Sequence, residues 1–303
     1  MCTSLIMHAN DGSTLLARTM DWHPFGATVL TLPQQYQWRS VVNPQRTLIN
    51  PYQVLGVGYN IPNLHVDIAD GINEYGLAMQ KLTFNQPNNP NSTFKLQTQQ
   101  HKIQLAPFEV VTWFLGNCQS IADVITQLPK IQLIPDSNQK HNVLGQTLHY
   151  ALTDSTGQFI NLIPQNGQLI AVDNPIGVVT NAPDLDKEIT KLDQFLDLTV
   201  PPTHLNAIAG DNFNGKKTMP GGFTPSARFI RATILKEHAI VPINEQANLI
   251  ETWHILNSVT VPKSRQRSDT YTLYRSAVDL QSRRLYFQPY DAVGISVYDF
   301  PQS

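Results

Sequence analysis

An α+β fold, in which strands and helices are mixed, is the fold class that the sequence predicts. Segments typical of strands and of helices follow in the order strands, helices, strands, helices, strands, which suits two sheets packed face to face between helical layers. The chain has 303 residues, 41% of them hydrophobic, which is enough to bury a large core. We find no internal repeat and no linker, and therefore expect residues 1–303 to form one domain.

The chain opens with a predicted β-hairpin. Residues 3–8 are rich in strand formers, residues 10–13 are a turn signature, and residues 14–21 return as a second strand. A hairpin of this length places residues 18–21 opposite or beside Cys2.

The remaining elements follow from local pattern. Residues 86–98 are polar and turn-forming, Pro107 opens a helical pattern through Phe114, and Ser120 with Asp123 resembles a capping box for a second helix. Further helices are expected over 183–198, 226–238 and 244–257. Strands are expected over 27–32, 54–58, 77–84, 149–153, 159–163, 169–172, 271–274, 284–287 and 293–297.

Cys2 is the candidate nucleophile. Removal of Met1 would place a thiol and a free α-amine on one residue, and the small side chain of Cys2 favours that removal. In model peptides a thiol titrates near about 8.5 and an α-amine near about 7.7–8.0, so at neutral pH the amine is suited to accept the thiol proton. The alternative is an incidental cysteine at the second position.

Arg18 and Asp21 are the expected neighbours of Cys2 at the end of the hairpin. An arginine near the thiol favours the thiolate, and a carboxylate can hold the ammonium that forms when the proton moves. The alternative for these two residues is an ordinary surface ion pair.

Composition argues against several other classes. A net charge of −2 with scattered Lys and Arg offers no basic surface for nucleic acid. No segment is apolar for long enough to span a membrane and the first residues lack signal-peptide features, so we expect a cytoplasmic protein. Two cysteines argue against a disulfide framework, and Cys118 is expected in the core. The nine histidines are dispersed, and no metal or other cofactor is expected.

Competing catalytic motifs are absent or incomplete. The chain has neither a Gly-x-Ser-x-Gly elbow nor a His-Glu-x-x-His pair. Residues 210–216 match the start of a phosphate loop, but Lys217 stands where Ser or Thr is needed, so we interpret them as a surface loop. Glutamine amidotransferases also begin with Met-Cys, but they typically continue with Gly, whereas Thr3 follows here.

Seven segments in order extend the pattern around Cys2 through most of the chain: 1–5, 17–21, 70–77, 115–118, 148–150, 180–183 and 223–229. Together they resemble the choloylglycine hydrolase family, cysteine-type N-terminal nucleophile (Ntn) hydrolases that include conjugated bile acid hydrolases and penicillin V acylases. The resemblance implies a four-layer αββα sandwich and hydrolysis of a linear amide. A non-catalytic binding relative of the same fold is the alternative from another class.

The resemblance also implies roles for individual residues. Cys2 is the nucleophile with Arg18 and Asp21 beside it, Asn181 is an oxyanion donor through its side chain, and Arg228 supports the site electrostatically. A second oxyanion donor is implied at position 83, where penicillin V acylases carry Tyr and bile acid hydrolases carry Asn. This chain has Thr83, whose backbone N–H could serve equally well.

The substrate is expected to be a small-molecule acyl amide. Residues 17–22 and 223–229 resemble the penicillin V acylase branch more closely, which favours a phenoxyacetyl-like or fatty acyl amide. Conjugated bile acids and acyl homoserine lactones are the alternatives. An apolar acyl pocket is expected to be lined by Met20, Trp22, Phe25 and Phe84, although core packing also explains such residues.

A homo-oligomer is expected, because family members commonly form tetramers. Part of that contact comes from an extended segment that corresponds to residues 197–222 here and is shorter than in penicillin V acylases. A shorter arm buries less surface, so we expect a weakened tetramer or a dimer.

Overall fold

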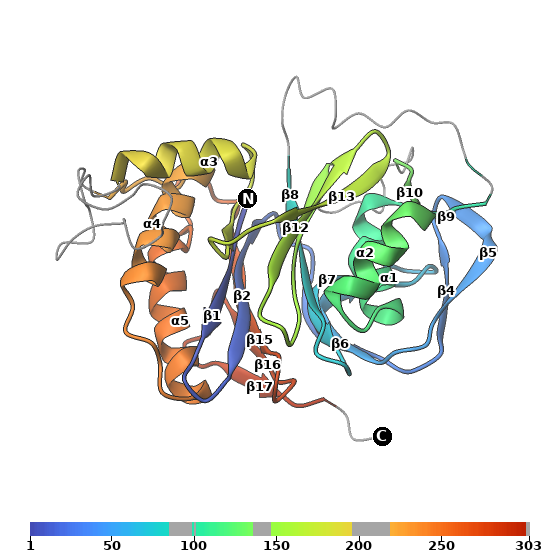
Figure 1. Cartoon of the computed structure of the whole chain (residues 1–303), viewed down its shortest axis with the longest axis horizontal. Helices are drawn as coiled ribbons and strands as arrows, with labels where there is room; N and C mark the ends of the chain where they lie inside the picture. Colours follow the sequence, from blue (N-terminus) through green and yellow to red (C-terminus); the bar gives the residue numbers. More distant parts are fainter. Residues whose placement is uncertain (85–98, 100, 136–146, 196–218, 301–303) are drawn as a thin grey trace.

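Two antiparallel sheets lie face to face, and helices cover the outer side of each sheet (Figure 1). This computed structural model of the chain describes residues 1–84, 99, 101–135, 147–195 and 219–300. The predicted α+β sandwich of the αββα type is confirmed. Residues 86–98 and 210–216, for which a polar turn and a surface loop were expected, lie outside the described residues.

The first sheet contains the predicted N-terminal hairpin. Its six strands follow one another in the order β14 (Val178–Val179), β1 (Cys2–His8), β2 (Thr14–Trp22), β15 (Tyr271–Asp279), β16 (Leu285–Pro289) and β17 (Ser296–Tyr298). β1 and β2 are interior strands, so both of their faces are buried along almost their whole length.

The second sheet has seven strands, in the order β13 (Gln168–Asp173), β12 (Phe159–Gln165), β11 (Leu148–Thr153), β8 (Ala78–Thr83), β7 (Val66–Asn73), β6 (Val54–Asn60) and β3 (Thr28–Leu32). Two small sheets pair β4 (Tyr36–Ser40) with β5 (Asn43–Asn50), and β9 (Ile103–Leu105) with β10 (Ile131–Leu133). Six strands of the four sheets were not predicted: β4, β5, β7, β9, β10 and, in the first sheet, β14.

The helices were predicted more completely. The structure contains α1 (Val110–Asn117), α2 (Ile121–Gln127), α3 (Leu185–Leu192), α4 (Pro225–His238) and α5 (Glu245–Val259), with 3-10 turns η2 (Pro107–Glu109), η3 (Leu128–Lys130) and η4 (Asp193–Phe195). Ser120 caps α2 as expected, its Oγ accepting from the backbone N–H of Asp123 at 3.2 Å. The Asp123 carboxylate accepts from the backbone N–H of Gln119, whereas a capping box requires the N–H of Ser120. The second hydrogen bond of the expected capping box is therefore wrong by one residue.

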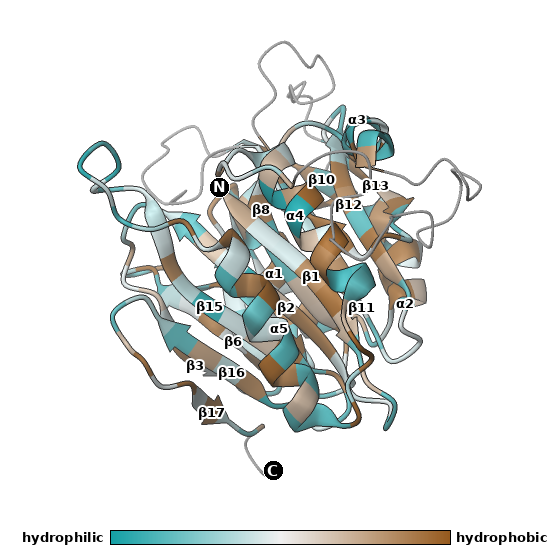
Figure 2. Ribbon diagram, turned by 90° about the vertical axis from the view of Figure 1, so that its left-hand side faces the viewer, coloured by the Kyte–Doolittle hydropathy of each residue, from teal (hydrophilic) through white to brown (hydrophobic). Residues whose placement is uncertain are grey.

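Two hydrophobic clusters hold the layers together. The larger fills the space between the sheets and continues beneath α1, where Cys118 is a buried free thiol as expected. The second lies between the first sheet and the helices α4 and α5. Figure 2 shows these two helices in front of β1 and β2. None of the helices formed by the described residues is long and apolar enough to cross a membrane.

Candidate active site

The hairpin register places Cys2, the first residue of the interior strand β1, directly opposite Met20. Cys2 is fully buried, and its Sγ lies 3.9 Å from Met20 Sδ. Side chains on directly opposed residues share a face of the sheet. The thiol therefore points into the layer between the two sheets, with Met20 as its immediate neighbour.

Arg18 lies on the same face as the thiol, two residues before Met20. Its Nη2 is 3.4 Å from Met20 Sδ, and its Nη1 donates to Lys81 O at 2.9 Å and to Asp70 Oδ1 at 3.4 Å. Burial alone would lower the pKa of Arg18, but the negative charges of the Cys2 thiolate and the Asp70 carboxylate raise it above its ordinary value. Arg18 is thus a buried cation close to Cys2, as predicted.

Asp70 is the counter-ion of Arg18 and is itself held in place. Tyr274 donates its hydroxyl to Asp70 Oδ1 and Ser276 donates to Oδ2, both at 2.5 Å. These bonds satisfy the carboxylate in the layer between the sheets and fix where Arg18 can lie.

Asp21 lies on the opposite face of β2, beside the backbone of Cys2 rather than beside its thiol. Its Oδ1 accepts from the hydroxyl of Thr272 at 2.5 Å, and its Oδ2 lies 3.5 Å from Arg228 Nη1. Asp21 Oδ2 has no hydrogen-bond partner among the described residues. The backbone oxygen of Asp21 accepts from the amine of Met1, whose pKa is lowered chiefly by burial.

Asn181 joins Cys2 to the end of β8. Its Oδ1 accepts from Cys2 N and from Arg228 Nη2, each at 2.8 Å. Its Nδ2 donates to Thr83 O at 2.8 Å and to Thr83 Oγ1 at 2.9 Å. Both amide hydrogens of Asn181 are therefore engaged, and the Thr83 hydroxyl, which accepts one of them, has its own hydrogen to donate elsewhere.

Arg228 enters the site from the first turn of α4, which Thr224 caps through its side chain. Its Nη1 donates to Cys2 O at 2.5 Å and to Thr3 Oγ1 at 2.6 Å. Burial lowers the pKa of Arg228, and Asp21 opposes that effect. Arginine stays protonated in proteins, so this residue clamps the start of β1 as a cation.

The four residues expected to line an acyl pocket occupy different places. Met20 contacts the thiol, whereas Trp22 and Phe25 are half-buried and pack edge-on against the rings of His23 and Tyr59. Phe84 is buried and stacks on His149, with ring centroids 4.4 Å apart.

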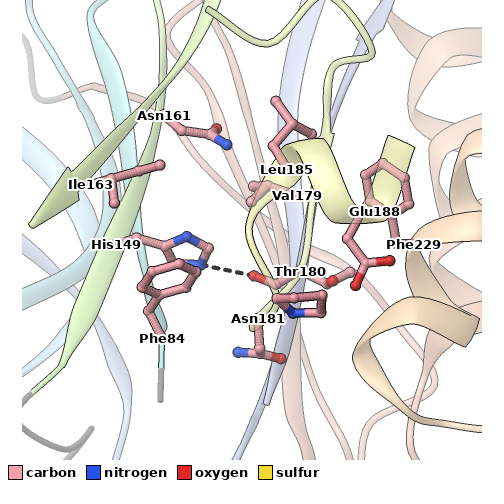
Figure 3. Close-up of a pocket in the computed structure, with 11 residues that line it drawn as sticks. Phe84, His149, Asn161, Ile163, Val179, Thr180, Asn181, Leu185, Glu188 and Phe229 are labelled. Carbon is pink, nitrogen blue, oxygen red and sulfur yellow. Dashed lines mark hydrogen bonds between the residues drawn. The ribbon is translucent and has the colours of Figure 1, made fainter. Parts of the chain in front are cut away.

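A cavity lies beside Asn181, between the second sheet and α3 (Figure 3). Its lining includes Phe84, His149, Asn161, Glu188 and Phe229. His149 donates its Nε2–H to Thr180 O at 2.8 Å, since a carbonyl can only accept, and burial lowers the pKa of His149 to about 4. A neutral His149 therefore ties β11 to the segment that carries Asn181.

Several residues that support the site were given no role from the sequence. Asp70 and His149 lie in segments that carry the family resemblance, which was the available signal. Thr3, Thr272 and Tyr274 had none, because their positions depend on strand register. Among the residues that the structure describes, no group of three or more His, Cys, Asp or Glu side chains is arranged to hold a metal ion.

Two facing antiparallel sheets between helical layers, with a cysteine at the start of an interior strand, define a cysteine-type Ntn hydrolase. The family model described as linear amide C–N hydrolases, choloylglycine hydrolase family, matches residues 2–303. The chain belongs to this family, and the enzyme hydrolyses a linear amide C–N bond.

Individual relatives agree with this assignment. A bile salt hydrolase/transferase from Clostridium perfringens is 29% identical over 310 residues, covering 99% of this chain and 92% of the relative. A crystal structure of a variant of the conjugated bile acid hydrolase from the same organism has a TM-score of 0.80 at 28% identity, covering 98% of this chain and 92% of that one. Penicillin V acylase from Agrobacterium tumefaciens shares the fold, with a TM-score of 0.76 at 18% identity over 98% of this chain and 86% of that one.

Proposed function

We propose that Met1 is removed and that Cys2 attacks the amide carbonyl of an acyl amide to form a thioester. The observation that supports this most directly is the bond from Cys2 N to Asn181 Oδ1, together with Asp21 Oδ2, which has no hydrogen bond and only an ion-pair contact with Arg228 at 3.5 Å. Loss of Met1 converts this amide nitrogen into an α-amine with additional hydrogens. Asp21 Oδ2 is an acceptor suited to one of them when the amine becomes an ammonium.

The proposed reaction has two steps, formation of the thioester and its hydrolysis. The α-amine of Cys2 takes the thiol proton, the thiolate bonds to the carbonyl carbon, and the C–N bond breaks as the ammonium returns its proton to the leaving amine. In the second step a water molecule gives a proton to the same α-amine and its oxygen bonds to the thioester carbon. The C–S bond then breaks, the carboxylic acid leaves, and the ammonium returns its proton to the sulfur, which restores the thiol. Arg18 stabilises the thiolate in both steps.

For the oxyanion we propose donation from Thr83 with support from Asn181. Because both Asn181 hydrogens go to Thr83, the hydroxyl hydrogen of Thr83 is a donor that Asn181 polarises. Losing one oxyanion donor commonly costs about 3 kcal/mol, and Asn181→Ala removes the group that holds and polarises the Thr83 donor, so it should lower turnover by roughly a hundredfold or more. Thr83→Val should lower turnover comparably if the hydroxyl donates. It should leave turnover unchanged if the backbone N–H is the donor, and Thr83→Ser is the control.

For the substrate we propose a conjugated bile acid first and a penicillin V-like amide second. Relatives of 25–29% identity that carry names of bile salt or conjugated bile acid hydrolases support the first. Residues 17–22 and 223–229, which resemble the penicillin V acylase branch, support the second. Thr83 matches neither branch, so position 83 does not discriminate between them.

A hydrolysis panel tests the proposal. Purified enzyme, with removal of Met1 verified by intact mass, is assayed on glycine and taurine bile acid conjugates, penicillin V and acyl homoserine lactones. We expect the largest kcat/KM on a bile acid conjugate. Preference for penicillin V would transfer the assignment to the second candidate, and turnover by protein that retains Met1 would contradict the role of the α-amine.

We also propose that the enzyme acts as a homo-oligomer in the cytoplasm and that residues 1–303 form one Ntn-hydrolase domain. Two free, buried cysteines are in keeping with a reducing compartment. No cofactor enters the proposed mechanism.

A further inference from the structure

The strand β15 changes its pairing with β2 at the level of the active site. Thr272 pairs with Asp21, but the next pair joins Tyr274 to Met20, so Leu273 is an extra residue in a β-bulge. Side chains normally alternate between the two faces of a strand, and a bulge interrupts that alternation. Thr272 and Tyr274, two positions apart, therefore lie beside residues on opposite faces of β2.

The two residues have different partners as a result. Tyr274 donates to Asp70, the counter-ion of Arg18, in the layer between the sheets. Thr272 donates to Asp21 Oδ1 at 2.5 Å on the helix side. β15 thus supports two carboxylates of the site: Asp70 through Tyr274, and Asp21 through Thr272.

The direction of the Thr272 hydrogen bond is fixed by a second contact. Thr272 Oγ1 accepts from the backbone N–H of Val261 at 2.8 Å, and Thr272 N donates to Val261 O at 2.9 Å. A hydroxyl has one hydrogen, and Val261 N supplies its own, so the hydrogen of Thr272 goes to Asp21. Asp21 Oδ1 is therefore the acceptor in this bond.

From these contacts we infer that Thr272 is a positioning residue for the reaction: it holds the Asp21 carboxylate by Oδ1, so that Oδ2, which contacts Arg228 at 3.5 Å without a hydrogen bond, can accept one from the ammonium of Cys2. The inference rests on the proposed role of Asp21. Thr272 is buried and its hydroxyl bonds to Asp21 and to Val261 N, so any effect on the reaction is exerted through Asp21. Without its hydroxyl, Asp21 loses a charge-assisted hydrogen bond and can turn away from the amine.

The test compares Thr272→Val with Thr272→Ser. Valine has nearly the shape of threonine but no hydroxyl, so its kcat should fall by roughly ten- to hundredfold with KM changed by less than about twofold. Serine restores the donor, and its kcat should lie within about threefold of the wild type. Turnover is expressed per folded molecule, with the folded fraction taken from thermal unfolding, so that lost stability does not register as lost catalysis.

Thr252→Val is the matched control. Thr252 is a buried residue of α5 whose hydroxyl has no hydrogen-bond partner in the portion of the chain that the structure describes. Its turnover should equal that of the wild type. If Thr272→Val does not fold, Thr272→Ala takes its place, because the smaller side chain cannot clash.

Asp21→Asn separates this inference from the proposed function. In the Asp21→Asn background, Thr272→Val should cost nothing further, since both changes remove the same support. Additive losses, or a Thr272→Ser variant as slow as Thr272→Val, would overturn the positioning role while leaving Asp21 in place. Wild-type turnover in Asp21→Asn would overturn the role of Asp21 itself.

Discussion

The charged residues around Cys2 lie on both faces of the β1–β2 hairpin. Arg18 lies on the face of the thiol, where a cation favours the thiolate. Asp21 lies on the other face beside the backbone of Cys2, where a carboxylate favours the ammonium. The proposed proton transfer creates a thiolate and an ammonium at the same time. The thiolate then has Arg18 on its side of the sheet, and the ammonium has Asp21 on the other side.

The first prediction concerns the nucleophile. Cys2→Ser should abolish or nearly abolish turnover and leave thermal unfolding almost unchanged, since a hydroxyl is far less acidic than a thiol but occupies similar space. Turnover and unfolding temperature are measured on the same preparation. Cys118→Ala is the control: Cys118 is buried at the end of α1, so stability should fall while kcat is retained. Wild-type-like rates in Cys2→Ser would contradict the mechanism.

The second prediction concerns Arg18. Arg18→Ala should slow alkylation of Cys2 by iodoacetamide at pH 7 by about tenfold or more, because the cation that favours the thiolate is gone. It should also destabilise the fold, since Asp70 is left as a buried charge without its counter-ion. Arg18→Lys keeps the charge and should alkylate faster than Arg18→Ala. An alkylation rate equal to wild type in both variants would show that Arg18 does not act on the thiol.

At the scale of secondary structure elements, buried polar contacts join neighbouring layers. His149 ties β11 to the segment after β14, and Lys81 on β8 forms an ion pair with Asp67 on β7 and donates to Phe108 O beneath the helical layer at 2.9 Å. These contacts connect the active-site strands to the rest of the sandwich.

The third prediction is a pH dependence of stability carried by His149. Its pKa is about 4 in the folded protein, below the roughly 6.5 of an unfolded chain, so the unfolded state binds the proton more readily. Stability is present above pH 6.5 and is lost as the pH falls toward 4. Between pH 7 and pH 5 the loss should be about 2 kcal/mol. His149→Gln, which keeps a donor but does not titrate, should show a shallower decline in urea unfolding over that range. An equal slope in both proteins would contradict the prediction.

The fourth prediction concerns the Lys81–Asp67 pair. Lys81→Met should destabilise the protein by about 3–5 kcal/mol, because it leaves Asp67 buried without its counter-ion. Adding Asp67→Asn removes that charge, so the double variant should recover part of the loss. Urea midpoints of the two single variants and the double variant measure the coupling. Strictly additive losses would show that the pair does not stabilise as a unit.

These same contacts explain which elements were predictable. The hairpin of β1 and β2 and the helices follow from local pattern. β7 was missed because Asp67 and Asp70 interrupt its apolar pattern, and their partners, Lys81 and Arg18, are distant in sequence. The candidate residues lie together in the structure: Cys2, Arg18, Asp21, Asn181 and Arg228. Thr272 was given no role, because no local pattern reveals the register of β15 against β2.

At the scale of the whole molecule, the fifth prediction concerns assembly. Most of the segment 197–222, on which the expectation of a weakened tetramer rests, lies outside the described residues, so the oligomeric state remains a prediction. Stable interfaces need more than about 1,000 Å² in total, and a short arm supplies less of it. Light scattering over a dilution series should show dissociation of a tetramer or a dimer. A tetramer that persists at nanomolar concentration would contradict the weakened arm, and a monomer throughout would contradict oligomerisation.

The position of β1 between β14 and β2 sets an order of events during synthesis. β1 leaves the ribosome before β14 and β15, which complete its surroundings and come from residues 178–179 and 271–279. At about 5–20 residues per second, β15 follows β1 by on the order of ten to fifty seconds. In the finished sheet Cys2 is fully buried and the amine of Met1 is bonded to Asp21. We therefore expect the proposed removal of Met1 to be fastest before β14 and β15 enclose Cys2, so that the active fraction depends on whether cleavage precedes closure of the sheet.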